Sequence, residues 1–259
     1  MNDLKELSVV IVTRNSQNEI LKCLESLSLW DKHIKDVVLV DNASSDNTLE
    51  RVREFQKVKV ISENRNTGFS KAVNKGIGET SGKYILILNP DVEIINDFYQ
   101  EIRNIFESNN NIGIIGPKIV YPDGTLQRSV RRFPDLISQI IMFLKLDHIY
   151  GGFTSVKRYS LFDFDYNKPQ YVDQVMGACF FTRRDLWDKL SGFDEHFFIW
   201  FEEVDYCLRA KSLGMLTYYA PLGPVRHILG KSFSQERLLR KQLWFLKSLI
   251  YFFWKHLLK

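Results

Sequence analysis

The chain has 259 residues, of which 45% are hydrophobic and 25% are charged. These values are typical of a soluble globular protein, and they exclude a largely disordered chain and a body embedded in a membrane. The three cysteines, Cys23, Cys179 and Cys207, show no C-x-x-C spacing, which argues against a disulfide framework or a zinc site. The first residues do not resemble a signal peptide, so we expect a cytoplasmic protein.

The positive charge is concentrated at the C-terminal end. Residues 231–259 contain seven Lys or Arg residues and one Glu, a net charge of +6, whereas residues 1–230 carry −2. This distribution predicts that the tail meets an anionic surface, and it does not favour a nucleic-acid-binding body. We therefore expect no nucleic-acid partner.

The first half of the chain alternates short β-branched runs with helical periodicities. This pattern is typical of a parallel sheet covered by helices. The expected strands are residues 8–13, 36–41, 58–62, 84–88 and 112–116. The expected helices begin after a cap at Asn18 and at about residues 48, 69 and 97.

The second half begins after Gly116 with a turn signal, Tyr121-Pro-Asp-Gly. Residues 150–171 are aromatic and aperiodic, and we expect them to form a loop over a site. The other expected elements are a helix at 138–146, a strand at 175–182, and helices at about 185–191 and 204–213.

Residues 236–259 show one long helical pattern. One face carries the apolar residues Leu239, Leu243, Leu246, Ile250, Phe253 and Leu257, and the opposite face carries Arg237, Lys241, Ser248, Lys255 and Lys259. Lys247 and Ser248 interrupt the apolar run before the ~20 residues that a membrane span needs. We expect a basic amphipathic helix that docks on the inner face of the cell membrane. The alternative is that the same apolar face packs on the enzyme's own body or on a second subunit, so a homodimer is left open.

Polar residues follow three of the predicted strands. Thr13 and Asn15 follow the first, Asp41 ends the second, and Asn89 and Asp91 follow the buried run YILIL. Ligands of open α/β sheets bind beyond the carboxyl ends of the strands, so these residues predict a ligand site at one rim. An acid at the end of a strand is, however, more often a turn former or a helix cap.

No G-x-G-x-x-G follows the first strand, and no phosphate-binding P-loop motif occurs. A bound diphosphate would therefore need another source of positive charge. Mg²⁺ or Mn²⁺ held by one or two carboxylates is the usual alternative, because these ions keep waters and phosphate oxygens as their other ligands. Asp91 is the natural carboxylate for such an ion.

Two further groups of residues are candidates for chemistry. Glu202, Glu203 and Asp205 follow an aromatic stretch and begin a helix, where acids either favour the helix dipole or act as a general base. His227, with Lys231 close behind it, is either an ordinary core or surface histidine or a contact for a cation or a phosphate.

Six ordered segments resemble family 2 glycosyltransferases of the GT-A fold, especially the rhamnosyltransferase-like enzymes of bacterial polysaccharide assembly. They are SVVIVTRNS, VDNASSDNT, ENRNTGFSKAVNKGI, LNPDVEI, GACFFTRRDLWDKLSGFDEHFFIWFEEVDYCLR and HILGKS, and the resemblance extends over nearly the whole chain. The resemblance implies an α/β, Rossmann-like GT-A fold with a mixed, mainly parallel central sheet. Residues 1–230 would form the transferase domain, with a nucleotide-binding half (about 1–120) and an acceptor half (121–230), and residues 231–259 the C-terminal amphipathic helix.

The resemblance also implies roles for individual residues. Asp41 would face the donor base, Gly68 would line the nucleotide pocket, Asn89 and Asp91 would occupy the two ends of the family's Asp-x-Asp motif, Glu203 would be the catalytic base, and His227 would contact the metal or the diphosphate. Asn89 and Glu203 depart from the family pattern, since each stands where Asp is commoner. The second departure leaves Glu202 and Asp205 as rivals for the base.

The implied reaction is an inverting transfer of L-rhamnose from dTDP-rhamnose to a hydroxyl of a saccharide or a lipid-linked saccharide in bacterial surface polysaccharide synthesis. Mg²⁺ or Mn²⁺ would be the cofactor. A transferase that uses a UDP-hexose and a non-catalytic scaffold that binds a sugar nucleotide are the alternatives.

Overall fold

The computed structural model describes residues 5–144, 146, 153–228 and 238–257. Its centre is an eight-stranded mixed sheet with the strand order β10-β13-β6-β12-β4-β1-β2-β3. Neighbouring strands pair in parallel except at β12 and β10, which run antiparallel to their neighbours. The strands are β1 (Leu7–Thr13), β2 (Ile34–Asp41), β3 (Val58–Ser62), β4 (Tyr84–Leu88), β6 (Ile112–Gly116), β10 (Gln170–Val172), β12 (Cys179–Arg183) and β13 (Leu216–Tyr219).

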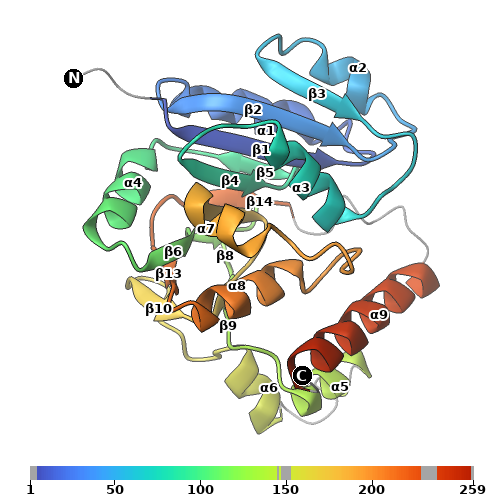
Figure 1. The fold of residues 1–259 in the computed structure, drawn as a ribbon, viewed down its shortest axis with the longest axis vertical. Coiled ribbons are helices and arrows are strands. Elements are labelled where there is room, and N and C mark those ends of the chain that lie inside the picture. The colour runs from blue at the N-terminus through green and yellow to red at the C-terminus, as the bar shows by residue number, and fades with distance from the viewer. Residues whose placement is uncertain (1–4, 145, 147–152, 229–237, 258–259) are drawn as a thin grey trace.

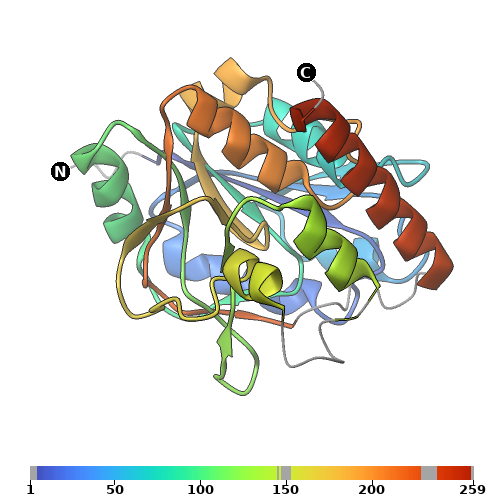
Figure 2. The ribbon, with the colours of Figure 1, turned by 90° about the horizontal axis from the view of Figure 1, so that it is seen from below.

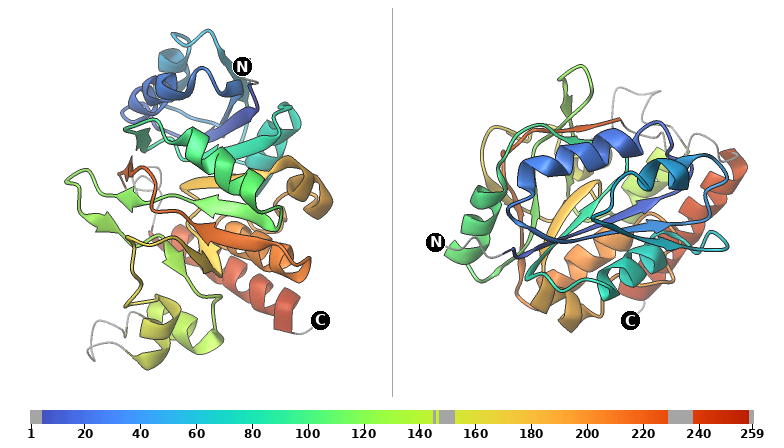
Figure 3. Two further views of the ribbon diagram at one scale, coloured as in Figure 1. Left: turned by 90° about the vertical axis from the view of Figure 1, so that its left-hand side faces the viewer. Right: turned by 90° about the horizontal axis from the view of Figure 1, so that it is seen from above.

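Helices cover both faces of this sheet, and Figure 3 shows α1 and α3 on opposite sides of the strands. In β1, Val10 and Val12 face one core and Val9 and Ile11 face the other, as the alternation of side chains along a strand requires. One core is completed by α1 (Ile20–Ser26), the 3₁₀ turn η1 (Leu27–Trp30), α2 (Thr48–Val52) and α4 (Tyr99–Ser108). The other is completed by α3 (Phe69–Gly78), α7 (Arg184–Leu190) and α8 (Glu202–Ser212).

Two smaller sheets lie beside the central one. One has the order β5-β14-β7-β8 and the other pairs β9 with β11. Their strands are β5 (Val92–Ile94), β7 (Ile119–Val120), β8 (Leu126–Gln127), β9 (Val130–Arg131), β11 (Gln174–Val175) and β14 (Val225–His227). The remaining helices are α5 (Leu136–Phe143), α6 (Thr154–Tyr159) and α9 (Leu238–Leu257), and Figure 1 shows them at the lower end of the molecule.

Two expectations about the second half were wrong. The expected loop at 150–171 contains helix α6 and the start of β10 in its described part. The expected strand at 175–182 is two strands, β11 and β12, because residues 176–178 leave β9 before the chain joins β4. Gly177 lies in this break, and its bare backbone faces the side chain of Glu203.

Helix α9 packs on the enzyme's own body through a face that the sequence did not predict. Ser248, Leu249 and Phe252 are buried, and Figure 2 shows the helix beside α8 and α5. Ser248 donates a hydrogen bond to the carbonyl of Ile199, whereas Leu243 of the predicted apolar face is 57% exposed. The alternative that the predicted apolar face packs on the body therefore does not hold for Leu239, Leu243, Ile250 and Leu257, which are all exposed. Among the described residues, no helix is long and apolar enough to cross a membrane.

Candidate functional site

The predicted rim lies at the carboxyl ends of β1, β2 and β4. The parallel register of β1 and β2 places Thr13 opposite Asp41, and both side chains are buried. The Thr13 hydroxyl has no hydrogen-bond partner among the described residues. A buried hydroxyl without a partner costs free energy, which makes it a candidate contact for a ligand.

Asp41 and Asn15 shape the turn that follows β2. The backbone N–H of Ser44 donates to Oδ2 of Asp41 at 3.0 Å, and the Ser44 hydroxyl donates to Oδ1. The Asn15 side chain accepts a hydrogen bond from the backbone N–H of Ser45 at 2.7 Å. Both residues therefore serve the turn, as acids and amides at strand ends commonly do. Their predicted roles toward a nucleotide stay predictions.

Gly68 occupies a position that only glycine fits. Its φ is +93°, and a Cβ placed there would lie 2.8 Å from the ring and from the carbonyl oxygen of Phe198. The side-chain amide of Asn42 donates to the Gly68 carbonyl at 3.2 Å. These contacts link Gly68 to Asn42 at the end of β2 and to Phe198, which lies in the segment that leads into α8.

Asp91 and His227 form a buried pair, although they are far apart in the sequence. β14 pairs antiparallel with β5, so that His227 lies opposite Val92 and next to Asp91. Nε2 of His227 lies 3.4 Å from Oδ1 of Asp91, and the two side chains are 4% and 3% exposed. Nδ1 of His227 contacts Oε1 of Gln127 at 2.7 Å, which orients the ring.

This pair fits a divalent cation. Oδ1 of Asp91 is buried and has no hydrogen-bond partner among the described residues, and the ring nitrogen that faces it is a common metal ligand. No cluster of three or more His, Cys, Asp or Glu side chains is found in the described parts of the chain. An ion here would therefore need diphosphate oxygens and waters as its other ligands, as Mg²⁺ and Mn²⁺ accept.

Asn89 and Lys231 are less clearly placed. The backbone N–H of Asn89 donates to the Ala178 carbonyl at 2.9 Å, which joins the end of β4 to the break between β11 and β12. Lys231 lies outside the described residues, so its predicted contact stays untested.

Glu202 and Glu203 lie side by side in the first turn of α8. Glu202 is buried, Glu203 keeps part of its surface exposed, and Oε2 of each lacks a hydrogen-bond partner in the described structure. Burial raises the pKa of both carboxyls, and the neighbouring charge of Glu203 raises the pKa of Glu202 further. The positive charge of Arg131 acts in the opposite direction on the pKa of Glu203.

Glu203 is linked to the segment that carries Asp91 through a series of backbone contacts. A Cβ placed on Gly177 would lie 3.7 Å from the Glu203 side chain, and the next residue, Ala178, is bonded to Asn89. Asn89 stands two residues before Asp91. A partly exposed carboxyl with a raised pKa has the properties of a general base.

Asp205 has a different role, because its side chain is fully buried and ion-paired. Nζ of Lys255 and Nε2 of His256 lie 2.6 and 2.8 Å from Oδ1, and Nε of Arg209 lies 2.7 Å from Oδ2. Burial acts to raise the pKa of Asp205, but the hydrogen bonds from His256 and Lys255 and the charge of Arg209 outweigh it and lower the pKa. A carboxylate so engaged cannot reach a substrate hydroxyl, which removes Asp205 as a rival for the base.

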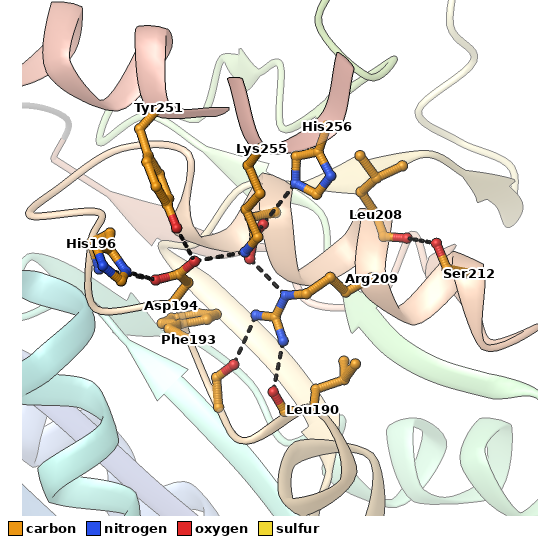
Figure 4. A network of polar contacts seen from close by, with 12 residues as sticks. Leu190, Phe193, Asp194, His196, Leu208, Arg209, Ser212, Tyr251, Lys255 and His256 are labelled. Carbon is orange, nitrogen blue, oxygen red and sulfur yellow. Dashed lines mark hydrogen bonds and ion pairs between the residues drawn. The ribbon is translucent and has the colours of Figure 1, made fainter. Parts of the chain in front are cut away.

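Further contacts attach α9 to Asp194, in the segment before α8. Lys255 also pairs with Asp194 at 2.7 Å, and the Tyr251 hydroxyl donates to the same carboxylate at 2.9 Å. Figure 4 shows Tyr251 and Lys255 pointing from α9 toward Asp194, with Arg209 alongside. We call Asp194, Asp205, Arg209, Tyr251, Lys255 and His256 the α9 anchor.

We expect Asp205→Asn to destabilise the protein by about 3–5 kcal/mol, because it removes a fully buried carboxylate from its partly buried partners Arg209, Lys255 and His256. Lys255→Met should cost less, since Arg209 and His256 still contact Asp205. The lowered pKa of Asp205 means that its contribution is present above the pKa of an unfolded Asp, about 3.9, and is lost as the pH falls through the lower folded value. Urea unfolding of both variants at several pH values measures these effects. Equal stability of Asp205→Asn and wild type would contradict the anchor.

Sequence reasoning missed Gln127, Lys255 and His256 as partners of the site and of its supporting helix. Gln127 stands in a two-residue strand with no pattern to mark it, and His256 has no informative spacing. The available signal for the anchor was a contrast in charge between two helices. Helix α8 begins with three acids, whereas α9 contains none.

Comparison with known proteins extends these observations. The family model for "Glycosyl transferase family 2" matches residues 8–191. The N-acetylglucosaminyl-diphospho-decaprenol L-rhamnosyltransferase of Mycobacterium tuberculosis is 29% identical over 85% of this chain and 75% of its own. The rhamnosyltransferase WbbL of Escherichia coli is 25% identical over 82% of this chain and 80% of its own.

Two solved structures share the fold. GalNAc-T7, crystallised with UDP, GalNAc and Mn²⁺, has a TM-score of 0.69 and 18% identity, over 90% of this chain and 45% of that one. The mannosyltransferase PcManGT of Pyrobaculum calidifontis, in complex with GDP-Man and Mn²⁺, has a TM-score of 0.64 and 15% identity, over 95% of this chain and 63% of that one. The expected GT-A architecture, with its mixed sheet and its C-terminal helix, is confirmed, and the chain belongs to glycosyl transferase family 2.

Proposed function

We propose that this chain is an inverting, metal-dependent glycosyltransferase that moves L-rhamnose from dTDP-rhamnose to a hydroxyl of a saccharide or lipid-linked saccharide in bacterial surface polysaccharide synthesis. The observation that carries the proposal is the buried Asp91–His227 pair, in which Oδ1 of Asp91 has no hydrogen-bond partner among the described residues. Two relatives whose names specify rhamnosyl transfer support the choice of sugar.

The candidate residues form two groups, one that would bind the donor and one that would act on the acceptor. Thr13, Asn15, Asp41 and Gly68 would surround the nucleoside, and Asn89 and Lys231 would lie toward the diphosphate. Mg²⁺ or Mn²⁺, held by Asp91 and His227, would supply positive charge against the departing diphosphate. Solved structures of two fold relatives contain Mn²⁺ with UDP or with GDP-Man, which supports a divalent ion here.

Glu203 would act on the acceptor side. Its carboxylate accepts the proton of the acceptor hydroxyl, the hydroxyl oxygen bonds to the anomeric carbon, and the bond from that carbon to the diphosphate breaks on the opposite side. The configuration at the anomeric carbon is inverted by this single displacement. Arg131, whose charge reaches Glu203, helps to keep the carboxylate ionised before it accepts the proton.

The lipid-linked form of the acceptor has its own support. The Mycobacterium tuberculosis relative is named for a decaprenol-linked acceptor. We propose a cytoplasmic enzyme that works at the inner face of the cell membrane.

A UDP-hexose donor is the second candidate, because fold relatives were crystallised with UDP and with UDP-GlcNAc. The two donors are separated by a thermal-shift panel of dTDP-rhamnose, UDP-hexoses and GDP-mannose, each with Mg²⁺ or Mn²⁺. A ligand at 100 times its dissociation constant adds ~2.7 kcal/mol of stability. We expect dTDP-rhamnose with metal to give the largest shift and to be consumed when acceptor is added. A larger shift with a UDP-hexose would change the donor, and binding without transfer or donor hydrolysis would indicate a scaffold.

A further inference from the structure

Helix α9 turns an apolar stripe away from the enzyme. The stripe consists of Leu239, Leu243, Ile250 and Leu257, whose exposed fractions are 74%, 57%, 60% and 66%. The anchor holds the opposite face of the helix against the body, so the stripe cannot turn inward without breaking the buried ion pairs of Asp205. The orientation of the stripe is therefore set by the fold.

Helix α5 adds a second stripe beside the first. Leu136, Ile137, Ile140 and Leu144 are 47%, 66%, 45% and 56% exposed and recur at helical spacing. The rings of Phe143 and Phe245 stack at 6.0 Å, which places the end of α5 against the middle of α9. Figure 2 shows both helices, with α6, on the same side of the molecule. Exposed apolar patches of this extent mark interaction surfaces.

The charge on these helices is of one sign. No Asp or Glu occurs within α5, α6 or α9. The cations on them are Lys157, Arg158, Arg240, Lys241, Lys247 and Lys255. Lys255 is used in the anchor, whereas Lys157, Arg158 and Lys247 are exposed. We call the exposed sides of α5, α6 and α9 the apolar-basic face.

We propose that the apolar-basic face is a docking surface for an anionic lipid bilayer, with the aliphatic side chains in the acyl boundary and the lysines and arginines among the phosphates. Interfacial helices combine these two features. A second copy of the chain fits less well, because a two-fold contact would bring the same cations together without a carboxylate on any of the three helices.

The face also lies close to the acceptor side of the site. The positive charge of Arg131 acts to lower the pKa of Glu203, and the residues that follow Arg131 lead into α5. The backbone N–H of Arg132 donates a hydrogen bond to the carbonyl of Tyr159 in α6 at 2.9 Å. Burial raises the pKa of Tyr159 in α6, and the negative charge of Glu203 raises this pKa further. Docking would therefore keep Glu203 near the plane of the headgroups, where the lipid-linked acceptor of the proposed function would present its hydroxyl. This last step rests on that proposed function, whereas the docking itself does not.

Co-sedimentation of the full chain with vesicles tests the proposal. We expect binding to vesicles of phosphatidylcholine with phosphatidylglycerol, weaker binding to phosphatidylcholine alone, and loss of the difference at high salt. Leu243→Asn/Ile250→Asn should weaken binding to both vesicles at least tenfold. Lys157→Gln/Lys247→Gln should weaken binding to the anionic vesicles alone, by about fivefold for each lysine.

The control is Leu29→Asn/Ile95→Asn, which changes two residues of 42% and 38% exposure on the α1 side of the molecule and should bind as wild type. Ile137→Asn/Ile140→Asn on α5 repeats the test if the α9 variant does not fold, as judged by thermal unfolding.

Absence of vesicle binding by wild type at low salt, or unchanged binding of both apolar variants, would overturn the proposal. A solution dimer that the apolar variants dissociate, without vesicle binding, would overturn it in favour of a second copy. A chain that sediments with anionic vesicles but binds no nucleotide sugar would support the docking surface and contradict the proposed function.

Discussion

Asp91→Asn is expected to abolish metal-stimulated turnover, with a loss of about 10² to 10⁴ in kcat. The change keeps the shape of the side chain but removes the charge of the buried carboxylate that faces His227 at 3.4 Å. A cation at this site is worth several kcal/mol of charge stabilisation against the leaving diphosphate. The measurement is the initial rate of sugar transfer as a function of Mg²⁺ or Mn²⁺ concentration, before and after treatment with EDTA.

Asp97→Asn is the matched control for this experiment. Asp97 makes a surface ion pair with Lys32 at 3.1 Å, and exposed pairs of this kind contribute little. We expect wild-type rates and wild-type metal dependence from it. If Asp91→Asn turned over at the wild-type rate and still required metal, the cation would bind elsewhere in the chain.

Glu203→Gln should lower turnover by about 10² to 10⁴, which is the usual contribution of a general base. Binding of the nucleotide sugar should change little, because the base acts on the acceptor. Glu203→Asp restores the residue that is commoner at this position but shortens its reach, so partial activity is expected. Rates and donor affinities are measured on the same preparations.

The pH dependence gives a second readout on Glu203. A base acts only when it is ionised, and burial raises the pKa of this carboxyl. The acid limb of the kcat profile should therefore lie at a higher pH than that of an ordinary glutamate, with activity falling as the pH falls through it. Glu203→Gln should remove this limb from its residual activity.

Glu202→Gln serves as the matched neighbour, because Glu202 is buried in the same helical turn. It should keep most of the activity and, by removing a nearby carboxyl, simplify the titration of Glu203. If Glu203→Gln transferred sugar at the wild-type rate while Glu202→Gln bound donor without turnover, the base would be Glu202.

The helix that carries Glu203 begins in an unusual way. Trp200 and Phe201 have φ values of +64° and +71°, in the left-handed region that bulky residues avoid. Phe201 packs against Phe245 and Phe252 of α9, with ring centroids 5.6 and 5.4 Å away. These contacts and the α9 anchor compensate for the strained conformation. We infer that α9 supports the position of Glu203 as well as presenting the apolar-basic face.

The amino-acid sequence by itself determined most of the first half of the fold. Buried runs such as SVVIVT and YILIL are short and rich in β-branched or aromatic residues, which favours strands over helices, and the structure has them as β1 and β4 with nearly the predicted bounds. The placement of Asp41, at the end of β2, and of Asp91, after β4, was predictable because parallel strands bring their carboxyl ends to one rim. These are local or nearly local properties.

Only the tertiary structure decided which distant residues share the site. The pairing of β14 with β5 brings His227 to Asp91, and sequence spacing carries no information on that register. Among the three acids of α8, Asp205 is excluded as the base because its carboxylate is held by Lys255 and His256, some fifty residues later in the chain. The docked face of α9 was decided in the same way. Periodicity ranks faces by their apolar content, but burial follows the partners that the body offers. Here those partners are the carbonyl of Ile199 and the carboxylates of Asp194 and Asp205.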